Sequence, residues 1–364
     1  MHGHLVIADI SGYTRFLTES ELEHANGIIS ELLNAVIGAT EAPLTVSSIE
    51  GDAVFLYGTM PEGTSGQAVL ESVELLYTSF ASALETMILN TTCKCNACAN
   101  INALGLKIVM HCGEYVTSEI GGRETVSGPD VIVAHRLLKN HIRESTGIDD
   151  YMLVTQACVD DLGIEAIVAG WVPHVEEYEH VGEVKGYVSS LPDVWEFVKQ
   201  QTENKVVKGE AWLSVSTHSQ APPAIVWDHL IDPFKRTIWM DVAGNHVTGD
   251  LGGRIGPGSA YHCAHGDGEI SIITVLDMKT ANYVTFVGTV MVGVAMTYTT
   301  YLIPSGSGTR IVSYAAPLVS IETGERLPDD ALAGMASPLS DGHASQIDRL
   351  VKMADAANAN LEAV

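Results

Sequence analysis

The chain has 364 residues, 46% of them hydrophobic, with a mean hydropathy of +0.17. This length and composition predict about two globular domains with apolar cores and exclude wholesale disorder. Lys and Arg number 19 against 45 Asp and Glu, a formal net charge of −26, which disfavours nucleic acid and anionic membranes as partners.

The N-terminus, Met1-His2-Gly3-His4, lacks the basic region of a secretory signal. Residues 283–303 carry no charge and are long enough to span a bilayer. Their many Val and Thr residues and two glycines predict two strands around a turn instead. We therefore expect a soluble, cytoplasmic protein, in which the six cysteines are reduced thiols.

Residues 1–199 are predicted to alternate between helices and strands and to form the first domain. Apolar spacing predicts helices at residues 21–39, 66–89 and 129–143. Strands are expected at residues 5–10, 45–49, 53–57, 104–111, 115–120, 152–155 and 175–180. The strands at 45–57 and those at 104–120 are each expected to form an antiparallel hairpin, turning at Gly51-Asp52 and at Gly113.

A polar, aperiodic linker is expected at residues 200–207, followed by a second domain at 208–364. This half is predicted to be mostly antiparallel strands with one long terminal helix at residues 340–361 and two shorter helices at 222–230 and 234–240. Its strands are expected at residues 211–217, 242–250, 259–265, 270–277, 284–290, 295–303 and 310–315.

Asp9 and Asp52 are the first candidates for a site, since each lies at the tip of a predicted strand. Asp is common in turns, so either residue alone is an ordinary turn residue. Together they suggest a carboxylate site for two Mg²⁺ or Mn²⁺ ions that bridge phosphate oxygens. The turn at Ser11-Gly12 would leave backbone N–H groups for phosphate. Arg136 is either a group that stabilises phosphoryl charge or a solvated surface side chain.

Four segments of the first domain occur in an order that resembles the class III nucleotidyl cyclase domain, the fold of adenylate and guanylate cyclases. They are VIADISGYTRF, SIEGDAVFLYG, LKIVMHCGEY and VSGPDVIVAHRLL. A fifth segment, EHVGEVKGYVSSLPDVWEF, resembles the last strands of that fold, so the similarity covers roughly residues 4–197. The resemblance implies a ferredoxin-like α+β domain with a mixed, largely antiparallel sheet.

The resemblance also implies a catalytic set, made of metal-binding Asp9 and Asp52 and of Arg136 acting from the second subunit of a homodimer. Nucleoside triphosphate would be bound by Ile10, Ser11, Gly12, Tyr13, Thr14 and, at the base, Thr125. Two ions would deprotonate the ribose 3′-hydroxyl and hold the triphosphate while pyrophosphate is released. The positions of the purine-reading Lys and the transition-state Asn fall on Ser48 and Ile132. The sequence therefore leaves two hypotheses, a diverged cyclase and an inactive cyclase-fold dimer that carries a small molecule.

Cys93, Cys95 and Cys98 form a C-x-C-x-x-C cluster that can reach one ion. Cys112 or His111 would supply the fourth ligand of a structural Zn²⁺ site. The alternatives are three ordinary thiols and a redox-sensing loop.

The second half resembles the START-like, polyketide-cyclase-like helix-grip fold, from STHSQAPPAIVWDHLIDPFKRTIWM through several strands to the terminal helix. That fold wraps a curved antiparallel sheet around its terminal helix and encloses an apolar cavity. The resemblance implies a hydrophobic small-molecule ligand, and the alternative is a filled core without a ligand. His262 and His265 are candidates for hydrogen-bonding groups in the cavity.

Overall fold

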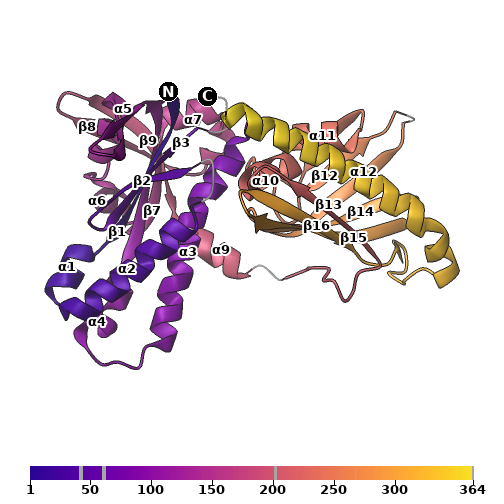
Figure 1. Ribbon diagram of the computed structural model, residues 1–364, viewed down its shortest axis with the longest axis horizontal. Helices are drawn as coiled ribbons and strands as arrows, with labels where there is room; N and C mark the ends of the chain where they lie inside the picture. The colour runs from indigo at the N-terminus through magenta and orange to yellow at the C-terminus, as the bar shows by residue number, and fades with distance from the viewer. Residues whose placement is uncertain (41–43, 60–62, 201–202, 267, 363–364) are drawn as a thin grey trace. The chain divides into compact units, whose positions relative to one another are not determined.

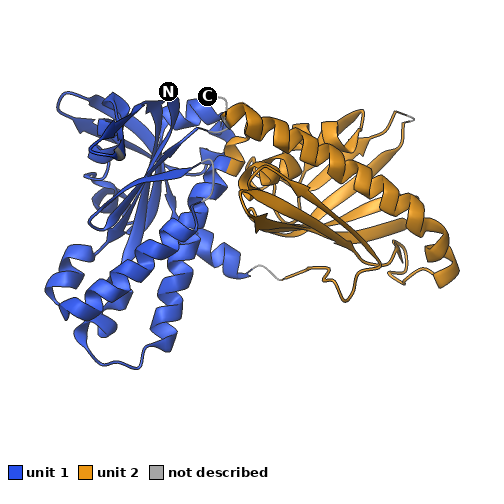
Figure 2. Cartoon of the chain, in the orientation of Figure 1, with its two compact units in different colours: residues 1–60, 69–200 blue, residues 61–68, 201–364 orange. Residues whose placement is uncertain are grey.

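The computed structural model describes residues 1–40, 44–59, 63–200, 203–266 and 268–362 (Figure 1). The chain divides into two compact units (Figure 2). Unit 1 comprises Met1–Met60 and Val69–Gln200, and unit 2 comprises Pro61–Ala68 and Gln201–Val364. The second unit thus includes Pro61–Ala68, which the sequence analysis expected in the first domain.

Unit 1 is built on a seven-stranded sheet with the strand order β2-β3-β1-β4-β7-β9-β8. Only β4 and β7 run parallel, and the other neighbours are antiparallel. The predicted α+β class with a mixed sheet is therefore confirmed. The strands are β1 (His2–Ser11), β2 (Thr45–Glu50), β3 (Ala53–Gly58), β4 (Gly105–Glu114), β7 (Tyr151–Thr155), β8 (Val172–Tyr178) and β9 (Gly182–Ser190), with a separate pair β5 (Val116–Ile120) and β6 (Arg123–Ser127).

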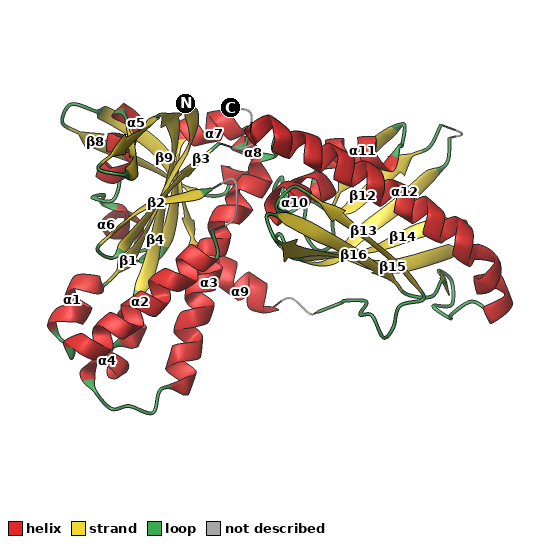
Figure 3. Ribbon diagram, viewed as in Figure 1, coloured by secondary structure: helices red, strands yellow, loops and turns green. Residues whose placement is uncertain are grey.

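Helices cover the sheet of unit 1 (Figure 3). Alternation along β1 decides which side chains meet them. Val6, Ala8 and Ile10 pack with α2 and α3, while Leu5 and Ile7 pack with α5. The helices are α1 (Tyr13–Thr18), α2 (Leu22–Gly38), α3 (Gly66–Asn90), α4 (Asn96–Ala99), α5 (Pro129–Arg136), α6 (Ile142–Thr146), α7 (Gln156–Leu162), α8 (Glu165–Val168) and α9 (Leu191–Gln200), with a 3₁₀ turn η1 (Ile101–Ala103).

Two secondary-structure predictions in unit 1 are wrong. The segment after β4 does not fold back on it as a hairpin. It forms β5, which pairs with β6 around Gly121-Gly122, two glycines at positive φ that favour such a tight turn. The helix predicted at residues 129–143 ends at Arg136. There the Asn140 side chain donates to the Leu137 carbonyl and accepts from the Ile142 N–H, which ends one helix and starts the next.

Unit 2 contains an eight-stranded antiparallel sheet with the order β10-β16-β15-β14-β13-β12-β11 and β17 paired to β15. The long helix α12 packs along β10 and against α10 and α11. It begins at Asp329, well before the predicted residue 340. The elements are β10 (Leu213–Ser219), α10 (Pro223–Ile231), α11 (Pro233–Met240), β11 (Gly244–Thr248), β12 (Ala260–Ala264), β13 (Ile270–Lys279), β14 (Tyr283–Met291), β15 (Val294–Ser305), β16 (Gly308–Ala315), β17 (Val319–Ser320) and α12 (Asp329–Glu362).

The uncharged segment 283–303 forms β14 and β15, which pair around Gly293 at φ +77°. The prediction of two strands around a turn is confirmed. Among the residues described, we find no helix with the length and apolar character needed to cross a bilayer.

The prediction that all six cysteines are reduced thiols is wrong. Cys112 in β4 and Cys158 in α7 form a disulfide, because α7 packs on β4 and brings their Cα atoms to 4.7 Å. The free cysteines among the described residues are Cys93, Cys95, Cys98 and Cys263.

Candidate functional site

Asp9 and Asp52 lie together at one end of the sheet in unit 1. Asp9 is near the end of β1, and Asp52 is in the turn between β2 and β3. The Ile10 N–H donates to the Asp52 carbonyl at 3.1 Å. Burial, and next the charge of Asp9, raise the pKa of Asp52. Two half-buried carboxylates that repel one another form a set of hard oxygen donors, which fits Mg²⁺ or Mn²⁺.

Lys107 is a member of this site that sequence reasoning missed. It is the register partner of Asp9 across β1 and β4, and its Nζ lies 2.8 Å from Asp9 Oδ2. Its Nζ also donates to the Leu138 carbonyl at 3.4 Å. Lys107 therefore balances the charge of Asp9 here, and a cation at Asp9 would replace that ion pair. The signal available in the sequence was the basic residue of LKIVMHCGEY.

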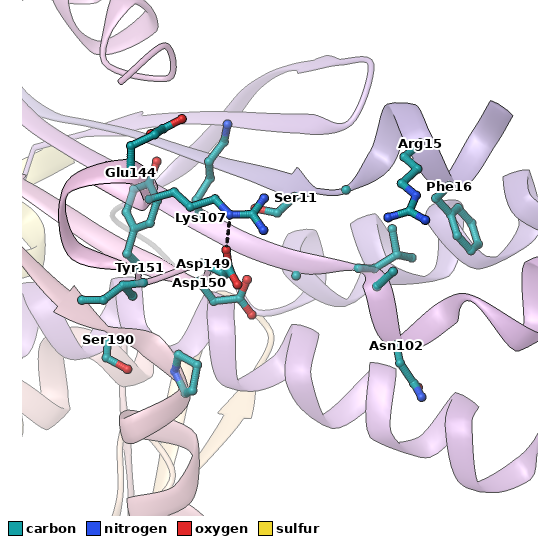
Figure 4. Close-up of a pocket in the computed structure, with 18 of the residues that line it drawn as sticks. Ser11, Arg15, Phe16, Asn102, Lys107, Glu144, Asp149, Asp150, Tyr151 and Ser190 are labelled. Atoms are coloured by element: carbon teal, nitrogen blue, oxygen red, sulfur yellow. Dashed lines mark ion pairs between the residues drawn. The ribbon is translucent and has the colours of Figure 1, made fainter. Parts of the chain in front are cut away.

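A hollow of about 970 Å³ is lined in part by Lys107 and Ser11, and we call it the unit 1 hollow (Figure 4). Neither Asp9 nor Asp52 is in its lining. Its charged and polar lining includes Ser11, Gly12, Arg15, Lys107, Arg143 and Asp150. The lining also includes four carboxylates, Glu19, Glu144, Asp149 and Asp150. Its three cations are each ion-paired: Arg15 with Glu19, Lys107 with Asp9 and Arg143 with Asp149. A ligand of moderate size fits this hollow in volume, and an anionic ligand would need bound cations to offset the acidic lining.

Of the five residues predicted to hold the triphosphate, Ser11 and Gly12 line the unit 1 hollow. Ile10 is buried, Tyr13 packs against the core, and Thr14 is exposed. Gly12 has φ +81°, and a Cβ there would lie 2.4 Å from the Ala103 carbonyl oxygen. The turn into α1 thus requires glycine, since any side chain would force the chain away from η1.

Asp150 lies at the wall of the hollow next to Asp149 (Figure 4). Burial, and next the charge of Asp149, raise its pKa from 3.8 to about 6. The folded state therefore holds a proton that the unfolded chain releases between about pH 4 and pH 6. Stability should fall as the pH rises through this window, because ionising Asp150 costs more in the folded state.

We expect Asp150→Asn to remove this cost. The variant should be more stable than the parent by about 1–3 kcal/mol at pH 8, and the difference should vanish below about pH 4. Urea unfolding at both pH values measures it. Asp149→Asn should give a smaller gain at pH 8, because the charge of Asp149 is only the second cause of the raised pKa. An equal gain at pH 4 and pH 8 would contradict the assigned pKa.

Arg136 does not meet the two aspartates within one chain. It is exposed at the end of α5 and lines a separate surface hollow with Ile132, Lys139 and Tyr178. Neither Asp9 nor Asp52 lines that hollow. Thr125 is half-buried in β6, opposite Ser118, and does not line the unit 1 hollow. The Ser48 hydroxyl donates to Glu50 at 2.9 Å.

The His-x-Gly part of LKIVMHCGEY holds α5 against β4. His111 is buried and bonds Thr155 at 2.9 Å and Asp130 at 3.3 Å. The other Asp130 oxygen accepts the Glu114 N–H at 2.7 Å. A Cβ on Gly113 would lie 2.3 Å from the Asp130 carboxyl. His111 thus has a structural role, and burial, the largest cause, lowers its pKa.

The cysteine cluster is completed by a residue that sequence reasoning did not find. The ligand atoms of Cys93, Cys95 and Cys98 lie within 4.8 Å of one another and of His24, in the first turn of α2. The predicted fourth ligand is wrong: Cys112 is disulfide-bonded and His111 bonds Thr155. His24 is about 70 residues before the cysteines in the sequence, so no ligand spacing links it to them. The fold brings it next to the cysteines.

Unit 2 contains a cavity of about 510 Å³ between its sheet and α12, and we call it the unit 2 cavity. Its lining includes His265, Ile273, Gly288, Met296, Tyr298 and His343. His265 bonds Ser271 at 3.0 Å. His262 is not in the lining and bonds Thr248 at 2.9 Å. Burial lowers the pKa of His343 to about 4, so this side chain is neutral at pH 7.

A buried arginine contacts Tyr298, one of the residues that line this cavity. Arg236 is fully buried, lies over the rings of Trp239, Tyr261 and Phe286, and donates to the Tyr298 hydroxyl at 3.3 Å. Its Nε has no partner among the described residues. Because Tyr298 accepts from Arg236, its own O–H is left to donate to another acceptor. The lining therefore combines apolar side chains such as Ile273 and Met296 with polar ones such as His265, and Tyr298 connects it to the buried charge of Arg236.

Comparison with known proteins gives three kinds of similarity. A family described as a protein of unknown function, DUF2652, matches residues 29–146, which is less than half of the chain. The uncharacterized protein Rv2561/Rv2562 of Mycobacterium tuberculosis is 26% identical over 163 residues, 45% of this chain and 73% of that protein.

Among solved structures, the guanylyl cyclase Cya2 is similar with 16% identity and a TM-score of 0.39, over 52% of this chain and 92% of that one. The adenylyl cyclase CyaB from P. aeruginosa is similar with 16% identity and a TM-score of 0.36, over 52% of this chain and 96% of that one. TM-scores this low assign no function to the chain.

Proposed function

We propose that unit 1 binds a metal–nucleoside triphosphate at Asp9 and Asp52 and converts it to a cyclic nucleotide. One observation carries the proposal: the two aspartates of the cyclase-like segments lie together as electrostatically coupled carboxylates. Two carboxylates at one sheet end are the donor set that holds Mg²⁺ or Mn²⁺ on phosphate oxygens. The bound ions, and Lys107 once released from Asp9, would supply the positive charge for the phosphates.

The chain's own residues have distinct roles in this proposal. Asp9 and Asp52 bind the ions, which when bound would lower the pKa of the ribose 3′-hydroxyl and neutralise the phosphates. Lys107 would move from Asp9 toward a phosphate oxygen, because the ions would bind the Asp9 carboxylate in its place. The turn at Ser11-Gly12 faces the hollow and would orient the triphosphate. In the reaction the 3′-oxygen bonds the α-phosphorus, the bond to the β-phosphate oxygen breaks, and pyrophosphate leaves.

Arg136 would act from the second subunit of a homodimer. Its exposure on α5 and its separation from the hollow of its own chain support this assignment. In a dimer, the exposed guanidinium would lie against the triphosphate bound by the other subunit. Its positive charge would there stabilise the pentavalent transition state. Thr125 would contact the base edge. Ser48 and Ile132 replace the usual base-reading and transition-state groups, which predicts slow turnover.

The test is incubation of the protein with each of the four nucleoside triphosphates and Mn²⁺ or Mg²⁺, with pyrophosphate and cyclic product measured. We expect one triphosphate to give equal amounts of both. Pyrophosphate without cyclic product, or no product from any of the four, would contradict the cyclase assignment.

One observation favours a second candidate function, in which unit 1 only dimerises and the protein carries a small molecule. Ile132, at the position of the transition-state Asn, is 55% exposed on α5. An exposed apolar side chain there suits a contact between subunits and cannot donate a hydrogen bond. Retention of metal–nucleotide binding without any turnover would favour this candidate.

In either case we propose that unit 2 binds an apolar molecule with an acceptor group, next to Tyr298. The walls of the unit 2 cavity and the buried charge of Arg236 support this. The resemblance to helix-grip proteins agrees with it. We propose that this ligand regulates unit 1, since both units are in one chain.

Filling the cavity should displace such a ligand. Gly288 lies in its lining, and a Cβ there would reach Ile273 at 3.4 Å, so Gly288→Val places methyl groups in the cavity. We expect affinity for 1-anilinonaphthalene-8-sulfonate, an apolar anion, to fall about 10-fold, because overpacking costs about 1–3 kcal/mol. Fluorescence titration measures it.

Gly244→Val is the matched control for this titration. Gly244 lies in β11 of the same sheet, outside the lining, and a Cβ there meets no atom within 4 Å. If both variants bind 1-anilinonaphthalene-8-sulfonate equally tightly, the probe binds outside the unit 2 cavity.

A further inference from the structure

We propose that His24, Cys93, Cys95 and Cys98 bind one structural Zn²⁺ ion. The four donor atoms come from two separate parts of the chain, the first turn of α2 and residues 93–98, which lead into α4 and include Cys98 within it. This assignment does not depend on the nucleotide site, since none of the four residues lines the unit 1 hollow.

The spacing of the donor atoms fits a tetrahedral zinc site. His24 Nδ1 lies 3.3 Å from Cys95 Sγ and 3.9 Å from Cys93 Sγ, and all four donors lie within 4.8 Å of one another. With bonds of about 2.3 Å to sulfur and about 2.0 Å to nitrogen, tetrahedral ligands lie roughly 3.5–3.8 Å apart. Small side-chain adjustments would therefore bring all four donors onto one ion.

Ordinary packing does not explain the cluster. His24 and Cys93 are exposed, and Cys95 and Cys98 are only half-buried. Free cysteines are usually buried in protein cores, as Cys263 is in unit 2. Three thiols and an imidazole at the surface gain little from burial, whereas soft sulfur and imidazole donors select Zn²⁺ over Mg²⁺.

The backbone around the cluster is already organised for a metal. The Cys98 N–H donates to Cys95 Sγ at 3.4 Å, a bond that stabilises a thiolate. The Glu21 carboxylate accepts the N–H groups of Asn96 and Ala97 at 3.2 and 3.1 Å, which ties α4 to the start of α2. Ala97 is fully buried in the core beneath. In Figure 1 α4 lies beside α2, where the two helices pack.

The site would be structural, because four protein ligands leave no open position for a substrate. Its effect would extend along the chain. Directly after α4, η1 brings the Ala103 carbonyl against Gly12 at the entrance to α1. Zinc at the cluster would therefore fix the segment that supports the Ser11-Gly12 turn.

The test is metal analysis of untagged full-length protein by mass spectrometry. We expect about one zinc per chain. His24→Ala and Cys95→Ser should each lower the zinc content at least about 10-fold after dialysis. His24→Cys should restore it, since a four-cysteine site also binds zinc. Cys263→Ser is the matched control and should keep full zinc.

Cobalt titration of the parent protein, after removal of zinc with a chelator, gives a readout that does not depend on variant folding. We expect thiolate charge-transfer bands and the visible spectrum of tetrahedral Co²⁺, with saturation at about one ion per chain. Full zinc content in Cys95→Ser, an octahedral cobalt spectrum, or iron with acid-labile sulfide in place of zinc would each overturn the assignment.

Discussion

Asp52→Asn should reduce formation of the cyclic nucleotide at least about 100-fold, the usual loss when one charge-stabilising group is removed from such a site. The fold should survive. Asp52 is half-buried beside Asp9, and burial together with the charge of Asp9 raises its pKa. A neutral side chain of the same shape removes that repulsion, so the unfolding free energy should stay equal or rise. Steady-state assay and urea unfolding of the same preparation measure both effects.

Glu50→Gln is the matched control for this variant. Glu50 belongs to the same hairpin but is directed to Ser48 and His135. Its replacement should change the rate less than about threefold, since a surface ion pair contributes little. Equal losses in the two variants would show that general charge, and not ion binding at Asp52, controls the rate.

Mixing two inactive variants should restore activity. Arg136→Ala keeps Asp9 and Asp52, whereas Asp52→Asn keeps Arg136. If each site takes aspartates from one subunit and arginine from the other, a mixed dimer contains one intact site. Random exchange then gives about a quarter of the parental activity, because half of the dimers are mixed and each has one of two sites. Assay after co-expression of the two variants measures it.

Asp9→Asn mixed with Asp52→Asn is the control, because no dimer of these two chains has both aspartates in one site. Recovery in this control, or no recovery with Arg136→Ala, would contradict a site shared between subunits. Arg136 is exposed, so its removal should leave the unfolding free energy within about 0.5 kcal/mol of the parent.

Local patterns predicted much of the architecture correctly. An apolar run predicted β1, and alternation predicted the β2–β3 hairpin. The Val, Thr and Gly content of residues 283–303 separated β14 from β15, where a hydropathy count alone suggests a membrane span. The predictions of secondary structure failed where one side chain or a pair of glycines, and not the apolar periodicity, determines where an element ends. Asn140 ends the helix that apolar spacing continues, and Gly121-Gly122 pair β5 with β6.

The sites could be predicted only in part, for a physical reason. Asp9 and Asp52 each lie next to a turn signal in the sequence, and the hairpin brings them together. Neither Lys107 nor His24 lies next to a turn signal, and their partners Asp9 and Cys95 are far away along the chain. For Lys107 the sequence offered only the basic residue of LKIVMHCGEY, and for His24 it offered nothing. Cys112 was predicted to be a zinc ligand because it is close in sequence to Cys93, Cys95 and Cys98. Instead it forms a disulfide with Cys158 of α7, which packs on β4.

Nucleotide binding tests the central claim most directly. Isothermal titration with a non-hydrolysable triphosphate analogue should show about one site per chain in the presence of Mn²⁺ and at least about 10-fold weaker binding without it. In the Asp9→Asn, Asp52→Asn double variant the Mn²⁺ dependence should disappear. Binding that is equally tight with and without Mn²⁺, or unchanged in the double variant, would contradict a metal–nucleotide site at these two aspartates.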